Sequence, residues 1–491
     1  MADDHPTQMW HTSRSAFERG TSYCPFARYV EYHAGPFGYG FQRKAQSLPL
    51  VTGTYTHAGP TAILQWVIDA RQHNGVQPDA VPDDVVRWAC EQAIEKYKKV
   101  IHTRGVLTYG GDDPEATRRL ETLVTEQSYL IEGLIWQWAL QRLPVYLRDY
   151  VIVAVEEEET LVLDCTCGMG DRVGDVSDHE SRGCLGIVLQ SRPDLIASRR
   201  SDGAYGYVEF KTAGQARKTW ADSWERKQQF LMGIVGAERR HGVEITHTWV
   251  EGLIKGKRQR PWGSDPETPK IQDTMLCYPY YKPPTVPGEL SEWRPQYNYI
   301  DRDGLEYTAG RKEGYRKTAL WEIPRLDAFP GIPDEMSVSE YWSKVLVEEY
   351  PFHAAKCISV IGPLPKQREQ IDKALRSLVA EEKLWQDRLW RIYEFAQANS
   401  VEWGDDRFMQ FVESVVPRSW NCDPFGPDHP CPNQPICHPV TDDWRDPVAR
   451  ELFVYRVPHH DPEKQQAVSR GLVPHEGWGQ EDEEVEEGEA E

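Results

Sequence analysis

The stretch PDLIASRRSDGAYGYVEFKTA, residues 193–213, predicts a β-hairpin. Its middle holds Asp202–Gly203, a dipeptide typical of two-residue hairpin turns. A Pro-Asp dipeptide opens the stretch, and an apolar, strand-like run closes it with Glu-Phe-Lys. We therefore expect two antiparallel strands joined by a tight turn.

Three charged side chains fall on one face of this hairpin. With a two-residue turn, Asp194 lies opposite Lys211. Glu209 then lies opposite Ile196, and the alternation of side chains brings both carboxylates and the lysine to the same side. Two carboxylates offer hard oxygen ligands to Mg²⁺ or Mn²⁺, and a neighbouring lysine can orient or deprotonate an attacking water. A solvated Glu/Lys alternation on a half-exposed strand is the other interpretation, which the hairpin alone leaves open.

The segments around the hairpin predict an α/β fold. Apolar residues recur at helical spacing from Asp83 to about His102 and from Pro114 to about Arg142. Val- and Ile-rich residues over 149–165 predict two strands or one bent strand, and a helix and a strand are expected over 221–242 and 245–255. The predicted parts are a mainly helical region with Cys24 and His57 (1–148), an α/β core (149–260), a Pro- and aromatic-rich insertion (261–340), C-terminal helices with a cysteine cluster (341–440) and an extended, acidic, disordered tail (441–491).

Composition sets wide limits on function. The chain has 491 residues, of which 40% are hydrophobic, and no run approaches the ~20 apolar residues that cross a bilayer. The N-terminal residues lack the pattern of a secretion signal, so we expect a cytoplasmic protein with no membrane partner. The net charge is −21, and residues 481–491 hold eight acidic and no basic residues. Basic patches persist at 255–260 and 310–317, so net charge neither supports nor excludes DNA binding.

Four cysteines are candidates for a metal cluster. Cys422, Cys431 and Cys437 are separated by eight and five residues in a proline-rich segment, and Cys24 lies far upstream. Thiolates favour iron–sulfur clusters or zinc, and a set of four suits either. Unrelated buried thiols are the alternative.

A second cysteine group lies within the predicted core. Cys165 and Cys167 form a Cys-x-Cys pair, and Cys184 follows. Free cysteine is among the most buried residue types. We expect these three to be ordinary core or loop thiols.

The order of these features resembles that of RecB-type nucleases of the PD-(D/E)XK superfamily. The similarity is to their iron–sulfur branch, which includes AddB and the CRISPR-adaptation nucleases, and covers roughly residues 24–437. It rests on an ordered set: Cys24, His57, Asp194, Glu209 and Lys211, Gln228 or Gln229, and then Cys422, Cys431 and Cys437.

The resemblance implies a restriction-endonuclease-like α/β core, with a central mixed sheet flanked by helices. Asp194, Glu209 and His57 would then bind the catalytic Mg²⁺ or Mn²⁺, Lys211 would serve the attacking water, and Gln228 would contact the site. A [4Fe–4S] cluster would staple the helical N- and C-terminal parts, with zinc as the alternative metal. The implied cluster ligands are Cys24, Cys422, Cys431 and Cys437.

The predicted function is therefore that of a DNA nuclease, an exonuclease acting on ends or single strands in recombination or repair. The chain has no G-x-x-x-x-G-K-[ST] phosphate loop, so unwinding requires a partner helicase. Trp220, Trp224 and Trp262 are candidates for stacking on unpaired bases. An endonuclease with the same site is one alternative. The other is an inactive nucleic-acid-binding or assembly protein stabilised by zinc or a cluster.

Overall fold

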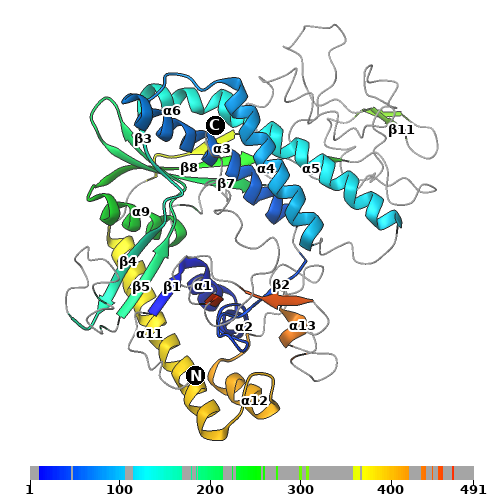
Figure 1. Ribbon diagram of the computed structural model, residues 1–491, viewed down its shortest axis with the longest axis vertical. Helices are drawn as coiled ribbons and strands as arrows, with labels where there is room; N and C mark the ends of the chain where they lie inside the picture. Colours follow the sequence, from blue (N-terminus) through cyan, green and yellow to red (C-terminus); the bar gives the residue numbers. More distant parts are fainter. Residues whose placement is uncertain are drawn as a thin grey trace, which may run out of the picture.

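The computed structural model describes residues 10–45, 48–104, 114–167, 186–213, 228–255, 358–364, 368–419 and 433–437, with short segments between and after them. The fold is mixed α/β, as the sequence predicts (Figure 1). Most of the predicted insertion and of the acidic tail lies outside the described residues, as do Cys422 and Cys431. None of the helices described is long and apolar enough to cross a membrane.

A five-stranded mixed sheet forms the centre of the upper part in Figure 1. Strands β7 and β8 are parallel, because the chain passes through helix α9 (Gln228–His241) between them, and the other neighbours are antiparallel. The order is β13 (Ile358–Ile361), β8 (Ile245–Ile254), β7 (Tyr205–Ala213), β6 (Leu195–Arg199) and β3 (Tyr150–Val155).

Strands β6 and β7 form the predicted hairpin, but its turn is wider than predicted. The backbone N–H of Arg199 donates to the carbonyl of Ala204 at 2.8 Å, which leaves four residues in the loop. The Asp202 carboxylate accepts a hydrogen bond from the Ala204 N–H at 3.1 Å and pairs with Arg199. Gly203 adopts a φ of 71°, a left-handed conformation that glycine tolerates. The aspartate thus closes a four-residue loop instead of a two-residue turn.

The wider turn changes the register of the hairpin. Ile196 pairs with Tyr207, not with Glu209 as the two-residue turn required, and the pairing of Asp194 with Lys211 is also wrong. Continuing the observed register by one residue places Asp194 opposite Glu209. Because the shift is an even number, every side chain keeps its face, and the prediction that the three charged residues share one side holds.

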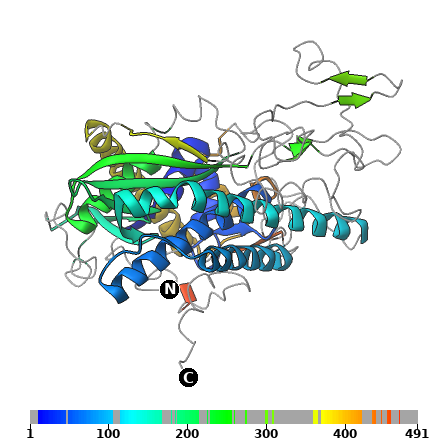
Figure 2. The same cartoon turned by 90° about the horizontal axis from the view of Figure 1, so that it is seen from above.

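Helices cover both faces of the central sheet (Figure 2). Val208 and Phe210 of β7 pack into a core with helices α3 to α6, whereas Ile196 and Tyr207 pack on the other face with α9 and α11. The predicted helices near 83–102 and 114–142 are confirmed, and α3 was not predicted. These helices are α3 (Leu48–Asn74), α4 (Asp83–Arg104), α5 (Pro114–Gln141), α6 (Leu143–Asp149) and α11 (Arg368–Asn399).

A second, three-stranded sheet lies beside the first. It has the order β1 (Trp10–Ser13), β5 (Gly186–Ser191), β4 (Glu159–Cys165). β1 runs parallel to β5, and β4 is antiparallel to it. The stretch 149–165 therefore forms two strands, and they belong to different sheets.

Residues from both ends of the chain share a third core, in the lower part of Figure 1. Arg28 and Glu382 form a fully buried ion pair at 2.7 Å there. The indole N–H of Trp10 donates to the same carboxylate at 2.8 Å. The elements of this part are α1 (Arg14–Glu18), the π-helical turn Arg19–Tyr23, α2 (Pro25–Tyr32), β2 (Phe41–Arg43), α12 (Asp406–Val415), α13 (Gln434–Cys437) and β14 (Phe453–Tyr455).

Candidate metal-binding sites

The hairpin brings two carboxylates together inside the protein. Asp194 precedes β6 and is 8% exposed, and Glu209 on β7 is 2% exposed. Asp194 Oδ2 accepts a hydrogen bond from the backbone N–H of Phe210 at 2.5 Å, and the Tyr207 hydroxyl donates to Glu209 Oε2. Lys211 Nζ lies 2.7 Å from Glu209 Oε1, and its side chain is 25% exposed. The structure thus assembles the three predicted hairpin residues.

Burial and like charge make Asp194 costly to ionise. Burial raises the pKa of Asp194 well above its usual range, and the charge of Glu209 raises it further, while Lys211 opposes both. Glu156 adds a third carboxylate, and its backbone N–H donates to the carbonyl of Asp194 at 3.3 Å. A divalent cation would offset this charge, and carboxylate oxygens are the ligands that Mg²⁺ and Mn²⁺ prefer. The donor set therefore fits such an ion.

His57 lies on helix α3, which packs closely against β7. A Cβ added to Gly53 would stand 2.6 Å from Thr212 Oγ1, so the glycine permits this approach. One turn later, the buried Nε2 atom of His57 has no hydrogen-bond partner among the described residues. Burial lowers the pKa of His57 to about 3, with contributions from Lys211 and Lys255. The imidazole is therefore neutral, the state in which histidine binds metals.

A cavity of about 330 Å³ opens beside Glu209. Tyr207 and Gly233 line it, and a Cβ on Gly233 would stand 2.4 Å from the Tyr207 hydroxyl. Two cations, Arg192 and Arg456, and two acids, Glu158 and Glu209, line this cavity. Arg192 also pairs with Glu156 at 3.0 Å. Gln228, the predicted site glutamine, begins α9 at this side of the sheet, but its side chain lies outside the described residues.

A second group of metal-ligand side chains lies at the far end of the three-stranded sheet. Cys165, Cys167, His179 and Cys184 place one ligand atom each within 4.8 Å of the others. The Cys165 Sγ atom is 3.0 Å from Cys167 Sγ and 3.2 Å from His179 Nδ1, and Cys167 Sγ is 3.4 Å from that nitrogen. This cluster could hold a metal ion.

The sequence predicted ordinary core or loop thiols here, and the structure adds that these thiols converge with a histidine. Single buried thiols would be scattered, but the strand pair β4 and β5 brings Cys165 and Cys184 to one end, where His179 joins them. The Cys-x-Cys spacing was the available sequence signal. His179 had none, because it lies twelve residues beyond Cys167 with no regular period between them.

Of the other predicted cluster, the structure describes two members. Cys24 precedes α2, and its sulfur accepts a hydrogen bond from the Ser419 N–H at 3.3 Å. Cys437 ends α13 and belongs to the same core, against which Cys24 packs. The two ends of the predicted set thus lie in one part of the fold.

The chain was compared with known families and proteins. No protein-family model matches it, and no curated protein matches its sequence. The proposals below therefore rest on the residues themselves.

Proposed function

We propose that this chain is a metal-dependent deoxyribonuclease with a PD-(D/E)XK core. The observation that carries the proposal is the buried pairing of Asp194 with Glu209, with Lys211 2.7 Å from the second carboxylate. These groups sit on a mixed sheet between two layers of helices, the arrangement expected of such a core.

Asp194 and Glu209 would hold Mg²⁺ or Mn²⁺. His57 would join them only after a movement, because its ligand nitrogens form no group with the two carboxylates among the described residues. A bound ion of this kind supplies polarisation of the phosphodiester and an acidified water. One hydrogen bond orients each carboxylate. The backbone N–H of Phe210 donates to Asp194, and the Tyr207 hydroxyl donates to Glu209. The ammonium of Lys211 is placed to orient the attacking water and to stabilise negative charge on the phosphate.

The proposed substrate is DNA with accessible ends or single strands. Arg192 and Arg456 line the cavity beside Glu209 and are the side chains that would contact a phosphate backbone there. Arg192 would then exchange its partner Glu156 for a phosphate. Trp224 is only 2% exposed, so stacking on a base is not among its roles, contrary to the sequence prediction. Recombination or repair with a partner helicase is the setting that this activity would serve.

We also propose an iron–sulfur cluster at Cys24 and Cys437, completed by Cys422 and Cys431. Support comes from Cys24 and Cys437, which lie over 400 positions apart in the sequence but belong to one core. Such a staple removes much of the loop-closure entropy that opposes this contact. Iron and acid-labile sulfide, measured on anaerobically purified protein, test the proposal. Iron-free protein would rule it out.

The nuclease proposal is tested with end-labelled linear DNA, single-stranded DNA and covalently closed circles in Mn²⁺. We expect the parent to degrade the first two and to spare the circles, which separates an exonuclease from an endonuclease. Asp194→Asn, Glu209→Gln and Lys211→Ala should each lose at least ~100-fold in rate but retain DNA binding.

A matched control is Lys383→Ala, because Lys383 forms a surface ion pair with Asp164 at 2.6 Å. This variant should cleave like the parent. If Glu209→Gln and Lys211→Ala also cleave like the parent, the assigned site is wrong. If the parent binds DNA but never cleaves it, the chain is a binding protein.

A further inference from the structure

The cluster Cys165, Cys167, His179 and Cys184 is the strongest feature that the nuclease proposal does not use. Three of its side chains are nearly inaccessible: Cys165 is 8% exposed, His179 3% and Cys184 4%. The backbone N–H of Cys184 also donates to the carbonyl of His179 at 3.0 Å, which holds these two residues together. The four ligand atoms therefore converge from a fixed backbone.

We propose that these four side chains bind a structural Zn²⁺. Three thiolates and one imidazole form a closed tetrahedral set, which leaves no position for a substrate or water. Soft sulfur ligands exclude Mg²⁺ and Ca²⁺, which take oxygen ligands. Zinc–sulfur bonds of about 2.3 Å place tetrahedral sulfurs about 3.8 Å apart. The Cys165 and Cys167 sulfurs are 3.0 Å apart and need only a small outward movement to reach this spacing.

The position of the cluster shows what the ion would stabilise. Cys165 ends β4 and pairs with Gly186 at the start of β5, so the site closes the connection between these strands. The packing beneath it is small, with Val162 and Val188 as the other members of its core. Because this core is small, a zinc ion would cross-link the two strands and stabilise their ends.

The same geometry argues against a catalytic role. At the opposite end of the strand pair, Ser191 lies against Glu159 and lines the cavity beside Glu209. The six residues of β5 span about 17 Å at ~3.3 Å per residue. The zinc would therefore fix the far end of a strand whose near end forms the cavity wall. This inference does not depend on the nuclease proposal.

The test is metal analysis of the full-length protein, purified with a reducing agent and Zn²⁺ and then desalted. We expect about one zinc per chain to remain, since structural sites bind zinc tightly. His179→Ala and Cys184→Ser should lose this zinc, whereas His179→Cys, which restores four ligands, should keep it. Cys90→Ser is the matched control, because Cys90 is a buried thiol in α4, apart from the cluster. Equal zinc in the parent and in Cys184→Ser would overturn the proposal.

A second measurement needs no variant and covers the case in which the substituted chains do not fold. Alkylation of the parent, followed by peptide mapping, gives the rate at which each cysteine reacts. We expect Cys165, Cys167 and Cys184 to react at least ~10-fold faster after chelation, because bound thiolates are protected. Unchanged rates, a disulfide within the cluster in reduced protein, or iron in place of zinc would each contradict a zinc site.

Discussion

Glu159 is expected to destabilise the protein at alkaline pH, and Glu159→Gln should remove this effect. The residue begins β4, is 2% exposed, and faces α9, where a Cβ on Gly236 would stand 2.4 Å from Oε2. Neither carboxylate oxygen accepts a hydrogen bond from the described residues. Burial raises the pKa of Glu159 to about 8, the charge of Glu157 adds to the rise, and Arg240 opposes it.

The magnitude follows from the two protonation states. In the unfolded chain the carboxyl has its ordinary pKa of 4.5, against about 8 in the folded protein. The folded state therefore holds a proton that the unfolded state has released, so stability falls as pH rises from 4.5 to 8. At 1.36 kcal/mol per pKa unit, the full loss is about 5 kcal/mol, and most of it is reached by pH 7.5.

Urea denaturation of parent and variant at pH 5 and pH 8 measures this loss. Glu159→Gln cannot ionise, so its free energy of unfolding should fall less than that of the parent by about 3–5 kcal/mol. His241 Nε2 lies 3.7 Å from Glu159 Oε1, so the measured difference includes any change in the titration of this imidazole.

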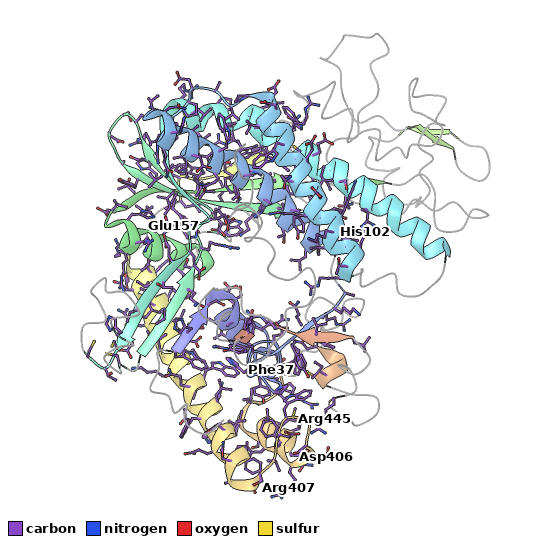
Figure 3. The ribbon with its side chains drawn as sticks, viewed as in Figure 1. Phe37, His102, Glu157, Asp406, Arg407 and Arg445 are labelled. Atoms are coloured by element: carbon purple, nitrogen blue, oxygen red, sulfur yellow. The ribbon has the colours of Figure 1, made fainter. Side chains whose placement is uncertain are left out.

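Glu157→Gln is the control, because this neighbour is 37% exposed at the side chain and pairs with Arg240 at 3.2 Å. Figure 3 labels Glu157 beside α9. The control should keep most of the pH dependence, since burial is the largest cause of the raised pKa. Equal losses of stability in the parent and in Glu159→Gln would refute this reasoning.

Three further substitutions test the core and the carboxylate site. Glu382→Ala leaves the buried guanidinium of Arg28 without its carboxylate, and should lower the free energy of unfolding in urea by about 3–5 kcal/mol; a loss below 1 kcal/mol would speak against a dry ion pair. Gly40→Ala places a Cβ 2.2 Å from the backbone of α2 at a φ of 83°, and should lower the free energy of unfolding by more than ~2 kcal/mol in the same assay. Gly75→Ala is the control, because Gly75 has a similar φ of 75° but open space around it, and its loss should be smaller. Tyr207→Phe removes a hydroxyl that orients Glu209, and calorimetry should show Mn²⁺ binding weakened about 10-fold; unchanged affinity would mean that this contact does not position a ligand.

The hairpin could be predicted from sequence because its signals are local. Side chains alternate along a strand, so the sequence alone showed which of them share a face. The predicted register was wrong by two residues, an even number, and the faces therefore stayed the same. The turn itself depended on the Asp202 side chain, which pairs with Arg199 and caps a wider loop than the Asp-Gly dipeptide suggests. Sequence patterns do not distinguish these two turns.

Helix α3 escaped prediction for a physical reason. Its glycines lower helix propensity, yet each permits a close approach: a Cβ on Gly59 would stand 2.3 Å from Ile135 of α5. Pro60 lies inside the same helix and is usually a stop signal. Tertiary packing overrode both local preferences, and this packing is what brings His57 to the end of β7. His179 of the cysteine cluster was missed in the same way, because two strands and a long connection bring it to the three cysteines.

Two sets of buried carboxylates lie in the described part of the central sheet. Their neighbouring side chains indicate which set is structural and which is a candidate metal site. Glu251 on β8 pairs in register with Phe210 and is fully buried, but it accepts hydrogen bonds from Arg142, Tyr146 and Trp138 at 2.6–2.9 Å. Donors from two helices thus compensate its charge and tie those helices to the sheet.

On the neighbouring strand, Glu209 accepts a hydrogen bond from Tyr207 and pairs with Lys211, but it also lies against a second buried acid, Asp194, whose pKa is raised. A fold that needed only stability would not place two acids together there, because removing either charge would lower the cost of burial. Lys211 offsets part of this charge, yet the pKa of Asp194 stays well above its usual range, so a bound cation would stabilise the pair further. The contrast with Glu251 therefore favours a metal-dependent site at the hairpin over a structural one.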